Sequence, residues 1–355
     1  MTRPSVAPDF ATDANYVAAG KPWDGQPTKV TPGAIKTEGW EPQVGLAAQH
    51  VNYMLNNHGG WINYLDASVG GIFGDGSDGA ATFDGATNYN SFSSRSGSVY
   101  TLTRDVFLTD ATLSAGVTIK TVGFRIYING TLTMTSAAPI IHCDGNDGSA
   151  GTAGAAVGNI LASSGAGGNG GASGGPNNGS AGTSVTAALG GSGGLAGTGA
   201  GGAGAAGTAT APTAAMGNIR VPGSVSTGML FGVSGVTVVQ GGAGGGGGGG
   251  GTGTGGGGGG GGGVLLLCAR LINLSGTAIL RAKGGNGAAG SGGANAGGGA
   301  GGGGGAVIVI YRGLVSGSSA VSACVSVVKG TGGAGTAGGN AGADGSNGNS
   351  YIITV

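Results

Sequence analysis

The sequence predicts a mainly β protein in which strands are layered with extended glycine-rich helices of the polyglycine II type. Three observations point to this fold class. Glycine makes up 92 of the 355 residues and gathers in blocks in the C-terminal part of the chain. Between these blocks stand β-branched and leucine-rich runs at a nearly constant spacing. Glycine destabilises an α-helix by about 1 kcal/mol per residue relative to alanine, which excludes helices from the glycine-rich part.

The composition also excludes several function classes. Only 8% of residues are charged and the formal net charge is +0, so no nucleic-acid partner is expected from bulk charge. The glycines run together and lack the strict spacing of collagen. Neither a membrane span nor a secretory signal is expected, which predicts synthesis in the cytoplasm. The three cysteines, Cys143, Cys268 and Cys324, are widely spaced and are predicted to be buried thiols.

Residues 1–70 form the first of three predicted segments. Apolar residues recur at helical spacing between residues 44 and 65, which predicts two short amphipathic helices or one helix broken at Gly59-Gly60. So small a piece has to pack on another part of the protein or on a partner, so we predict a subunit interface formed by Trp40, Leu46, Val51, Tyr53, Met54, Leu55, Trp61 and Leu65.

Residues 71–148 are predicted to form a β-rich connector. Strands are expected at 100–108, 117–120 and 124–128, where apolar and polar residues alternate. Asn129-Gly130 suits either a hairpin or one corner of a β-solenoid coil, and the short, evenly spaced strands favour the solenoid.

Residues 149–355 are predicted to form a glycine-rich repeat domain. Glycine blocks lie at about 148–207, 241–263, 284–305 and 330–349. The order of glycine block, strand, turn, strand and basic residue repeats, with copies starting at Val264, Val307 and Tyr351. These starts are 43 and 44 residues apart, a period typical of stacked supersecondary units.

The glycine blocks have a physical role in such a stack. An isolated extended polyglycine helix has no internal hydrogen bonds and loses much conformational entropy on ordering. Several blocks side by side can satisfy one another's N–H and C=O groups, because no Cβ atoms keep them apart. The sequence therefore predicts a glycine layer packed on a strand layer.

The sequence offers little catalytic chemistry. No phosphate-binding loop or metal-ligand cluster is present, so no enzyme, cofactor or metal is expected. Asp75, Asp78, Asp144 and Asp147 lie in glycine-rich turns, where turn formation is favoured over calcium binding. A glycosidase would need two carboxylates, which Asp105, Asp110, Asp144 and Asp147 are able to supply in principle.

Binding residues are predicted at two places. Residues 208–240 are the long low-glycine stretch between blocks, and they hold a candidate loop or, alternatively, a further strand pair. Tyr311-Arg312 is the second place, with plain alternation within a strand as its alternative. The receptor-binding candidates are Met216, Arg220, Met229, Phe231, Tyr311 and Arg312.

A resemblance adds to this interpretation. Gly39-Trp40-Glu41-Pro42, Asn52-Tyr53-Met54-Leu55-Asn56 and Trp61-Ile62-Asn63-Tyr64-Leu65 resemble the N-terminal region of bacteriophage tail-fibre and related virion proteins. Gly74-Asp75-Gly76-Ser77-Asp78-Gly79, with Thr103-Arg104-Asp105 and Thr118-Ile119, resembles a β-rich module seen in such proteins. The glycine blocks are similar in composition to the polyglycine-sandwich adhesins at the fibre tips of T-even phages.

The resemblance implies a virion protein, a tail fibre or fibre-tip adhesin, with other tail or baseplate proteins and a bacterial surface receptor as partners. It also implies that residues 1–70, with the interface residues named above, form the virion-attachment segment. Fibres of this kind are commonly homotrimers, although lateral glycine helices are also able to satisfy one another within a monomeric tip. The alternatives are an architectural fibre or capsid spike without a receptor, and a β-helical glycan depolymerase.

Overall fold

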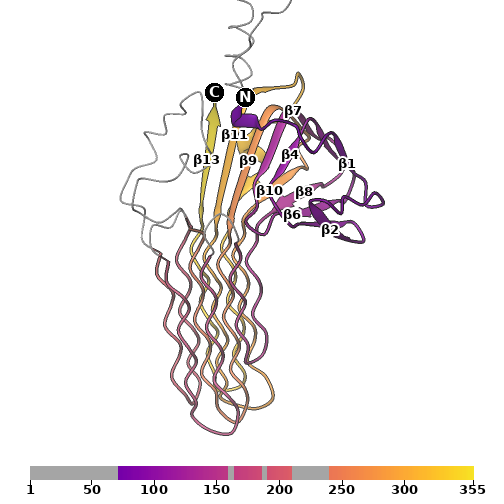
Figure 1. The fold of residues 1–355 in the computed structure, drawn as a ribbon. Helices are drawn as coiled ribbons and strands as arrows, with labels where there is room; N and C mark the ends of the chain where they lie inside the picture. The colour runs from indigo at the N-terminus through magenta and orange to yellow at the C-terminus, as the bar shows by residue number, and fades with distance from the viewer. Residues whose placement is uncertain (1–70, 159–163, 186–189, 210–239) are drawn as a thin grey trace, which may run out of the picture. The chain divides into compact units, whose positions relative to one another are not determined.

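The computed structural model describes residues 71–158, 164–185, 190–209 and 240–355 (Figure 1). The chain divides into two compact units, and one of them, residues 1–72 with 222–224, falls almost entirely outside the described residues. The predicted helix and the eight interface candidates from Trp40 to Leu65 lie outside them as well. The second unit, residues 73–221 and 225–355, holds the β structure and the glycine-rich segments.

The prediction of a mainly β protein is confirmed. A seven-stranded sheet has the order β1-β5-β7-β9-β11-β13 with β4 also paired to β7, and a six-stranded sheet has the order β12-β10-β8-β6-β3-β2. The described helical elements are two short 3-10 turns, η1 (Gly71–Phe73) and η3 (Val321–Cys324). The strands are β1 (Ala81–Phe83), β2 (Ser93–Ser96), β3 (Val99–Leu102), β4 (Val106–Leu108), β5 (Ala111–Leu113), β6 (Thr118–Lys120), β7 (Ile126–Met134), β8 (Ile140–His142), β9 (Val264–Leu274), β10 (Ile279–Arg281), β11 (Ala306–Leu314), β12 (Val325–Ser326) and β13 (Asn349–Thr354).

From β5 onwards the chain alternates between the two sheets, one strand in each. All described strand pairs are parallel except β2 with β3. The sheets enclose one apolar core, to which the first contributes residues such as Leu132, Leu267 and Val309 and the second contributes Ile119 and Leu280. The buried-exposed-buried pattern of short strands such as β1 and β5 follows from this one-sided burial.

The C-terminal repeat is present, but its register differs by one residue from the prediction. Val264 pairs with Ala306 instead of Val307, so the offset is 306 minus 264, or 42 residues. Tyr351 pairs with Ile308, an offset of 43. The physical reason is the pleat: a slip by one residue would turn Val307 away from the core that it shares with Leu265.

Two local strand predictions are wrong. The run 100–108 is not one strand, because β3 ends at Leu102 in the six-stranded sheet and β4 begins at Val106 in the seven-stranded sheet. Arg104 stands at the corner between them, held by side-chain bonds described below. Asn129-Gly130 forms neither a hairpin nor a corner, since β7 runs through it with a register shift between Ile128 and Thr131. Gly130 is required there because a Cβ would overlap the carbonyl oxygen of Thr109, to which its own N–H donates.

The glycine blocks form a bundle of extended segments that run away from the sheets and return through turns at the far end (Figure 1). Their hydrogen bonds are lateral, as the sequence analysis expected, and recur at every third residue. The N–H groups of Gly242, Gly245 and Gly248 donate to the antiparallel segment 255–263 at 2.8–2.9 Å. The N–H groups one residue further on, at positions 243, 246 and 249, donate to segment 190–199. Those at positions 244, 247 and 250 donate to segment 177–185. A three-residue period is that of an extended helix with three residues per turn.

The innermost segments have neighbours all round. Segment 241–251 also accepts bonds from 164–174, 201–207 and 297–303, so six segments surround it. All residues of 241–251, 255–263 and 296–305 are buried. Almost any Cβ there would overlap a neighbouring backbone, which is why these segments are nearly pure glycine. Outer segments such as 339–348 keep glycine at every third position and place larger residues between.

The bundle continues the sheets directly. Segments 255–263, 296–305 and 339–348 lead without a break into β9, β11 and β13. Their hydrogen bonds continue the parallel pairing, as when Gly304 N–H donates to Ser346 and Asn349 N–H to Gly305. The two parts of the chain before and after residue 148 contribute to the same sheet, because β7 from the first part pairs with β9 from the second.

Candidate functional site

Two of the six predicted receptor-binding residues, Tyr311 and Arg312, belong to the part of the chain that the structure describes. Met216, Arg220, Met229 and Phe231 lie outside the described residues. Tyr311 is half-buried on β11 and packs against the core, which agrees with the alternative that it belongs to ordinary strand alternation. Arg312 is exposed, and neighbouring residues of a strand point to opposite faces of the sheet.

A row of polar residues instead crosses the outer face of the six-stranded sheet, at the carboxyl ends of its strands. Lys120 pairs in register with His142, and His142 pairs with Arg281. Thr101 and Ser326 extend the row on either side. The residues before them, such as Ile119 and Leu280, point into the core, so the row faces outward.

Asp144 organises the middle of this row. Its Oδ2 accepts a hydrogen bond of 2.8 Å from Arg281 Nε and lies 2.6 Å from the terminal nitrogen Nη2 of that guanidinium. Its Oδ1 accepts the backbone N–H of Lys283 at 2.8 Å. Nδ1 of His142 accepts a hydrogen bond of 3.3 Å from the backbone N–H of Asp144 and lies 3.0 Å from Oδ2 of the same residue.

These contacts keep the Asp144 carboxylate ionised. Burial, the largest single influence, raises the pKa of Asp144, but the hydrogen bonds from His142, Arg281 and Lys283 outweigh it and lower the pKa to about 2. A carboxyl group with this pKa is ionised near neutral pH and is a poor proton donor.

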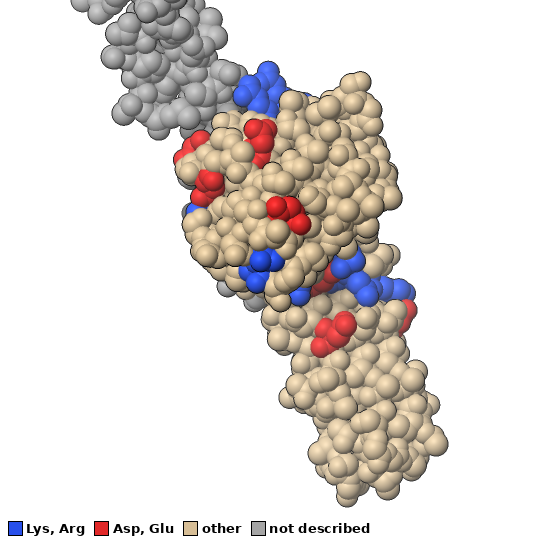
Figure 2. Space-filling model, turned by 90° about the vertical axis from the view of Figure 1, so that its right-hand side faces the viewer, with Lys and Arg blue, Asp and Glu red and all other residues tan. Residues whose placement is uncertain are grey.

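A pocket of about 690 Å³ opens beside the row, where the sheet meets the glycine bundle. This volume lies within the range of small-molecule sites. Figure 2 shows basic and acidic side chains gathered at the junction, whereas the bundle beyond it carries no charge on the face shown. The residues that line the pocket are Thr101, Lys120, Val122, His142, Cys143, Asp144, Gly145, Asn146, Asp147, Ala156, Val157, Gly158, Arg281, Lys283 and Gly284.

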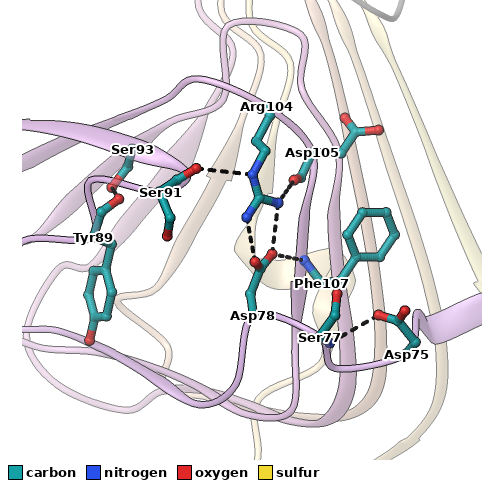
Figure 3. A network of polar contacts seen from close by, with 9 residues as sticks. All are labelled: Asp75, Ser77, Asp78, Tyr89, Ser91, Ser93, Arg104, Asp105 and Phe107. Carbon is teal, nitrogen blue, oxygen red and sulfur yellow. Dashed lines mark hydrogen bonds and ion pairs between the residues drawn. The ribbon is translucent and has the colours of Figure 1, made fainter.

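The aspartates of the first turn have structural partners. Asp78 accepts two hydrogen bonds from the Arg104 guanidinium, at 3.0 and 2.5 Å, and one of 2.8 Å from the backbone N–H of Phe107 (Figure 3). Arg104 also donates to the backbone oxygens of Ser91 and Asp105, so it joins the turn to the corner between β3 and β4. Asp75 accepts the Ser77 N–H at 3.0 Å, the local turn bond that the sequence predicted for it.

Asp147 and Asp105 also accept hydrogen bonds from backbone N–H groups. Asp147 Oδ1 accepts the N–H of Asn286 at 2.6 Å, and Asp105 binds the backbone and guanidinium of Arg125. Within the described ranges, no three His, Cys, Asp or Glu residues are grouped closely enough to hold a metal ion. No described helix is long and apolar enough to cross a membrane.

The row of Lys120, His142 and Arg281 was missed by sequence reasoning. The sequence contains part of the pattern that would predict it, since a basic residue follows each strand pair of the repeat, as Lys283 and Lys329 do. What the sequence does not contain is the register that aligns residues 139 positions apart, as for His142 with Arg281. Comparison of the chain with protein-family models, with curated proteins and with solved structures found no match.

Proposed function

We propose that this chain is a structural virion protein of a bacteriophage, a tail fibre or fibre-tip adhesin that contacts the host cell surface. The observation that carries the proposal is the glycine bundle, in which segments 241–251, 255–263 and 296–305 are buried and bonded laterally on all sides. A body with so many backbone hydrogen bonds and so few charges suits exposure outside the cell.

The proposal includes a finer description of the fold. The alternation of strands between two mainly parallel sheets supports a short β-solenoid, and the three-residue hydrogen-bond period supports polyglycine II. Such a scaffold would hold its end turns rigidly. These turns carry small polar residues, among them Thr252, Thr254 and Ser291, and they would offer a host-facing surface.

The oligomeric state is part of the same proposal. A homotrimer would form through residues 1–70 rather than through the bundle, because the inner segments of the bundle satisfy one another within one chain. Multi-angle light scattering of the full chain measures the mass directly. A trimer that becomes monomeric in the double variant Leu46→Asp/Leu55→Asp would support the predicted interface, and a monomeric wild type would contradict it.

Electron microscopy with gold-labelled antibody against the full chain tests the proposed location, and binding of the purified chain to host cells tests the proposed activity. Gold at the distal ends of fibres together with cell binding would support an adhesin. Gold on a shaft or capsid without cell binding would favour the architectural alternative. Particles that stay unlabelled, although the antibody recognises the native chain, would overturn the virion assignment.

A further inference from the structure

The pocket at the junction of the six-stranded sheet and the glycine bundle has the features of a ligand site of its own. The evidence for this ligand site is the geometry of the pocket, and it does not depend on the proposed virion function. We propose that this pocket binds an acidic oligosaccharide, whose carboxylate or phosphate group pairs with Lys120 and Lys283 and whose hydroxyl groups bond to Asn146 and Asp147.

The first support is an uncompensated positive charge. Lys120, Arg281 and Lys283 line the pocket against two carboxylates, those of Asp144 and Asp147. The Asp144 carboxylate already contacts Arg281 and His142. Among the described residues, no ion pair is found for the ammonium groups of Lys120 and Lys283. These two cations are therefore available to an anion that enters the pocket.

The second support is the row itself. Basic side chains in consecutive register positions repel one another across a sheet, because neighbouring strands lie only about 4.8 Å apart. Lys120, His142 and Arg281 occupy three such positions in β6, β8 and β10. Asp144 offsets this repulsion for His142 and Arg281, but Lys120 has no carboxylate partner among the described residues, so an anionic ligand would complete the row.

The third support concerns the rest of the ligand. The pocket, at about 690 Å³, is far larger than a bare phosphate or carboxylate needs. Asn146 donates its amide to the Ala155 carbonyl, which leaves the side-chain oxygen of Asn146 to accept a hydroxyl proton. Asp147 uses Oδ1 for the Asn286 N–H and keeps Oδ2 for the same purpose. Among the described residues, no aromatic side chain lines the pocket, which argues against a stacked nucleobase.

Isothermal titration of the full chain with three probes tests the proposal: tri-galacturonate, the neutral galactotriose and inorganic phosphate. We expect tri-galacturonate to bind at least tenfold more tightly than either of the others, and to weaken as salt rises from 0.05 to 0.5 M because the pocket is open to solvent. Equal binding of galactotriose would overturn the role of the charge. Equal binding of phosphate would overturn the role of the sugar, and no binding of tri-galacturonate would overturn the site.

Variants place the binding in the pocket. Lys120→Ala/Lys283→Ala is expected to weaken tri-galacturonate binding at least tenfold, the loss expected for one or two charge-assisted hydrogen bonds. Lys329→Ala is the matched control, because Lys329 pairs with Asp344 at 3.2 Å and does not line the pocket. It should bind within twofold of the wild type. An unchanged affinity in the double variant, with a native thermal transition, would overturn the assignment.

Discussion

Replacing a single glycine in the interior of the bundle tests how the structure is held together. Gly258 lies in the fully buried segment 255–263, donates its N–H to the Gly168 carbonyl at 2.8 Å and accepts the Gly154 N–H at 2.8 Å. A Cβ built on it would lie 2.7 Å from both the carbonyl carbon of Gly245 and the oxygen of Gly246, and closer still to the Gly245 oxygen. Real Cβ atoms essentially never come within 3.0 Å of such atoms, so Gly258→Ala requires the backbones to separate.

The expected loss of stability is large for one methyl group. Forcing an extra carbon into a close-packed core costs about 1–3 kcal/mol. The separation also lengthens lateral bonds such as Gly245 N–H to Gly259, now 2.9 Å, and each bond lost from a buried pair is worth about 1 kcal/mol. With two such bonds lost, Gly258→Ala should lower the free energy of unfolding by about 3–5 kcal/mol.

Gly175→Ala is the matched control, since Gly175 lies in an end turn and a Cβ there would have its nearest neighbour 3.9 Å away. Its free energy of unfolding should stay within about 1 kcal/mol of the wild type. Circular dichroism during denaturation and amide hydrogen exchange of residues 241–263 are the suitable measurements, because all three tryptophans lie in residues 1–70. Equal unfolding midpoints and equal exchange protection for the two variants would refute the lateral packing of the bundle.

Three further predictions concern side chains. The pKa of Asp144 is lowered to about 2 from an ordinary 3.8, so its carboxylate contributes about 2 kcal/mol to the free energy of unfolding. This contribution is present above pH 4 and is lost as the pH falls to 2. Asp144→Asn should therefore flatten that part of an acid-unfolding curve. Burial raises the pKa of the thiols of Cys143 and Cys268 to about 11 and 12, so neither should react with a disulfide reagent at pH 8 until the protein unfolds. Arg104→Ala leaves the nearly buried Asp78 without its cation and should cost about 2–3 kcal/mol in thermal unfolding, whereas Arg104→Lys should recover part of the loss.

Composition and spacing were sufficient to predict the coarse fold. The apolar runs that begin at Val264 and Ala306 became β9 and β11, and the glycine blocks between them became the laterally bonded bundle. Both follow from local physics. Leucine and β-branched runs bounded by glycine favour buried strands, and extended glycine leaves its N–H and C=O groups to be satisfied by neighbours.

The register and the candidate site could not be predicted in the same way. A run in which nearly every residue is apolar, such as Val264 to Cys268, carries no alternation that distinguishes one face from the other, so the pairing with β11 was misjudged by one residue. Lys120 and Arg281 belong to strands far apart in the chain, and only the stacking of β6, β8 and β10 brings them to one pocket. Asn129-Gly130 fits a hairpin locally, but the pairing of β7 with β9 and β5 outweighs that preference.

The direct continuation of the sheets into the bundle explains how so much glycine becomes ordered. Ordering glycine costs more entropy than ordering any other residue, and a single extended segment gains no internal hydrogen bond in return. Here β9, β11 and β13 hold three parallel segments side by side, because the pairing of these strands sets the spacing and the register of the glycine segments that lead into them. The other segments bond laterally to these three, as 241–251 does to 255–263. The strands therefore act as the template of the bundle, and a one-residue insertion between Gly305 and Ala306 should disturb the hydrogen bonding of the bundle more than the same insertion in the end turn at Gly292.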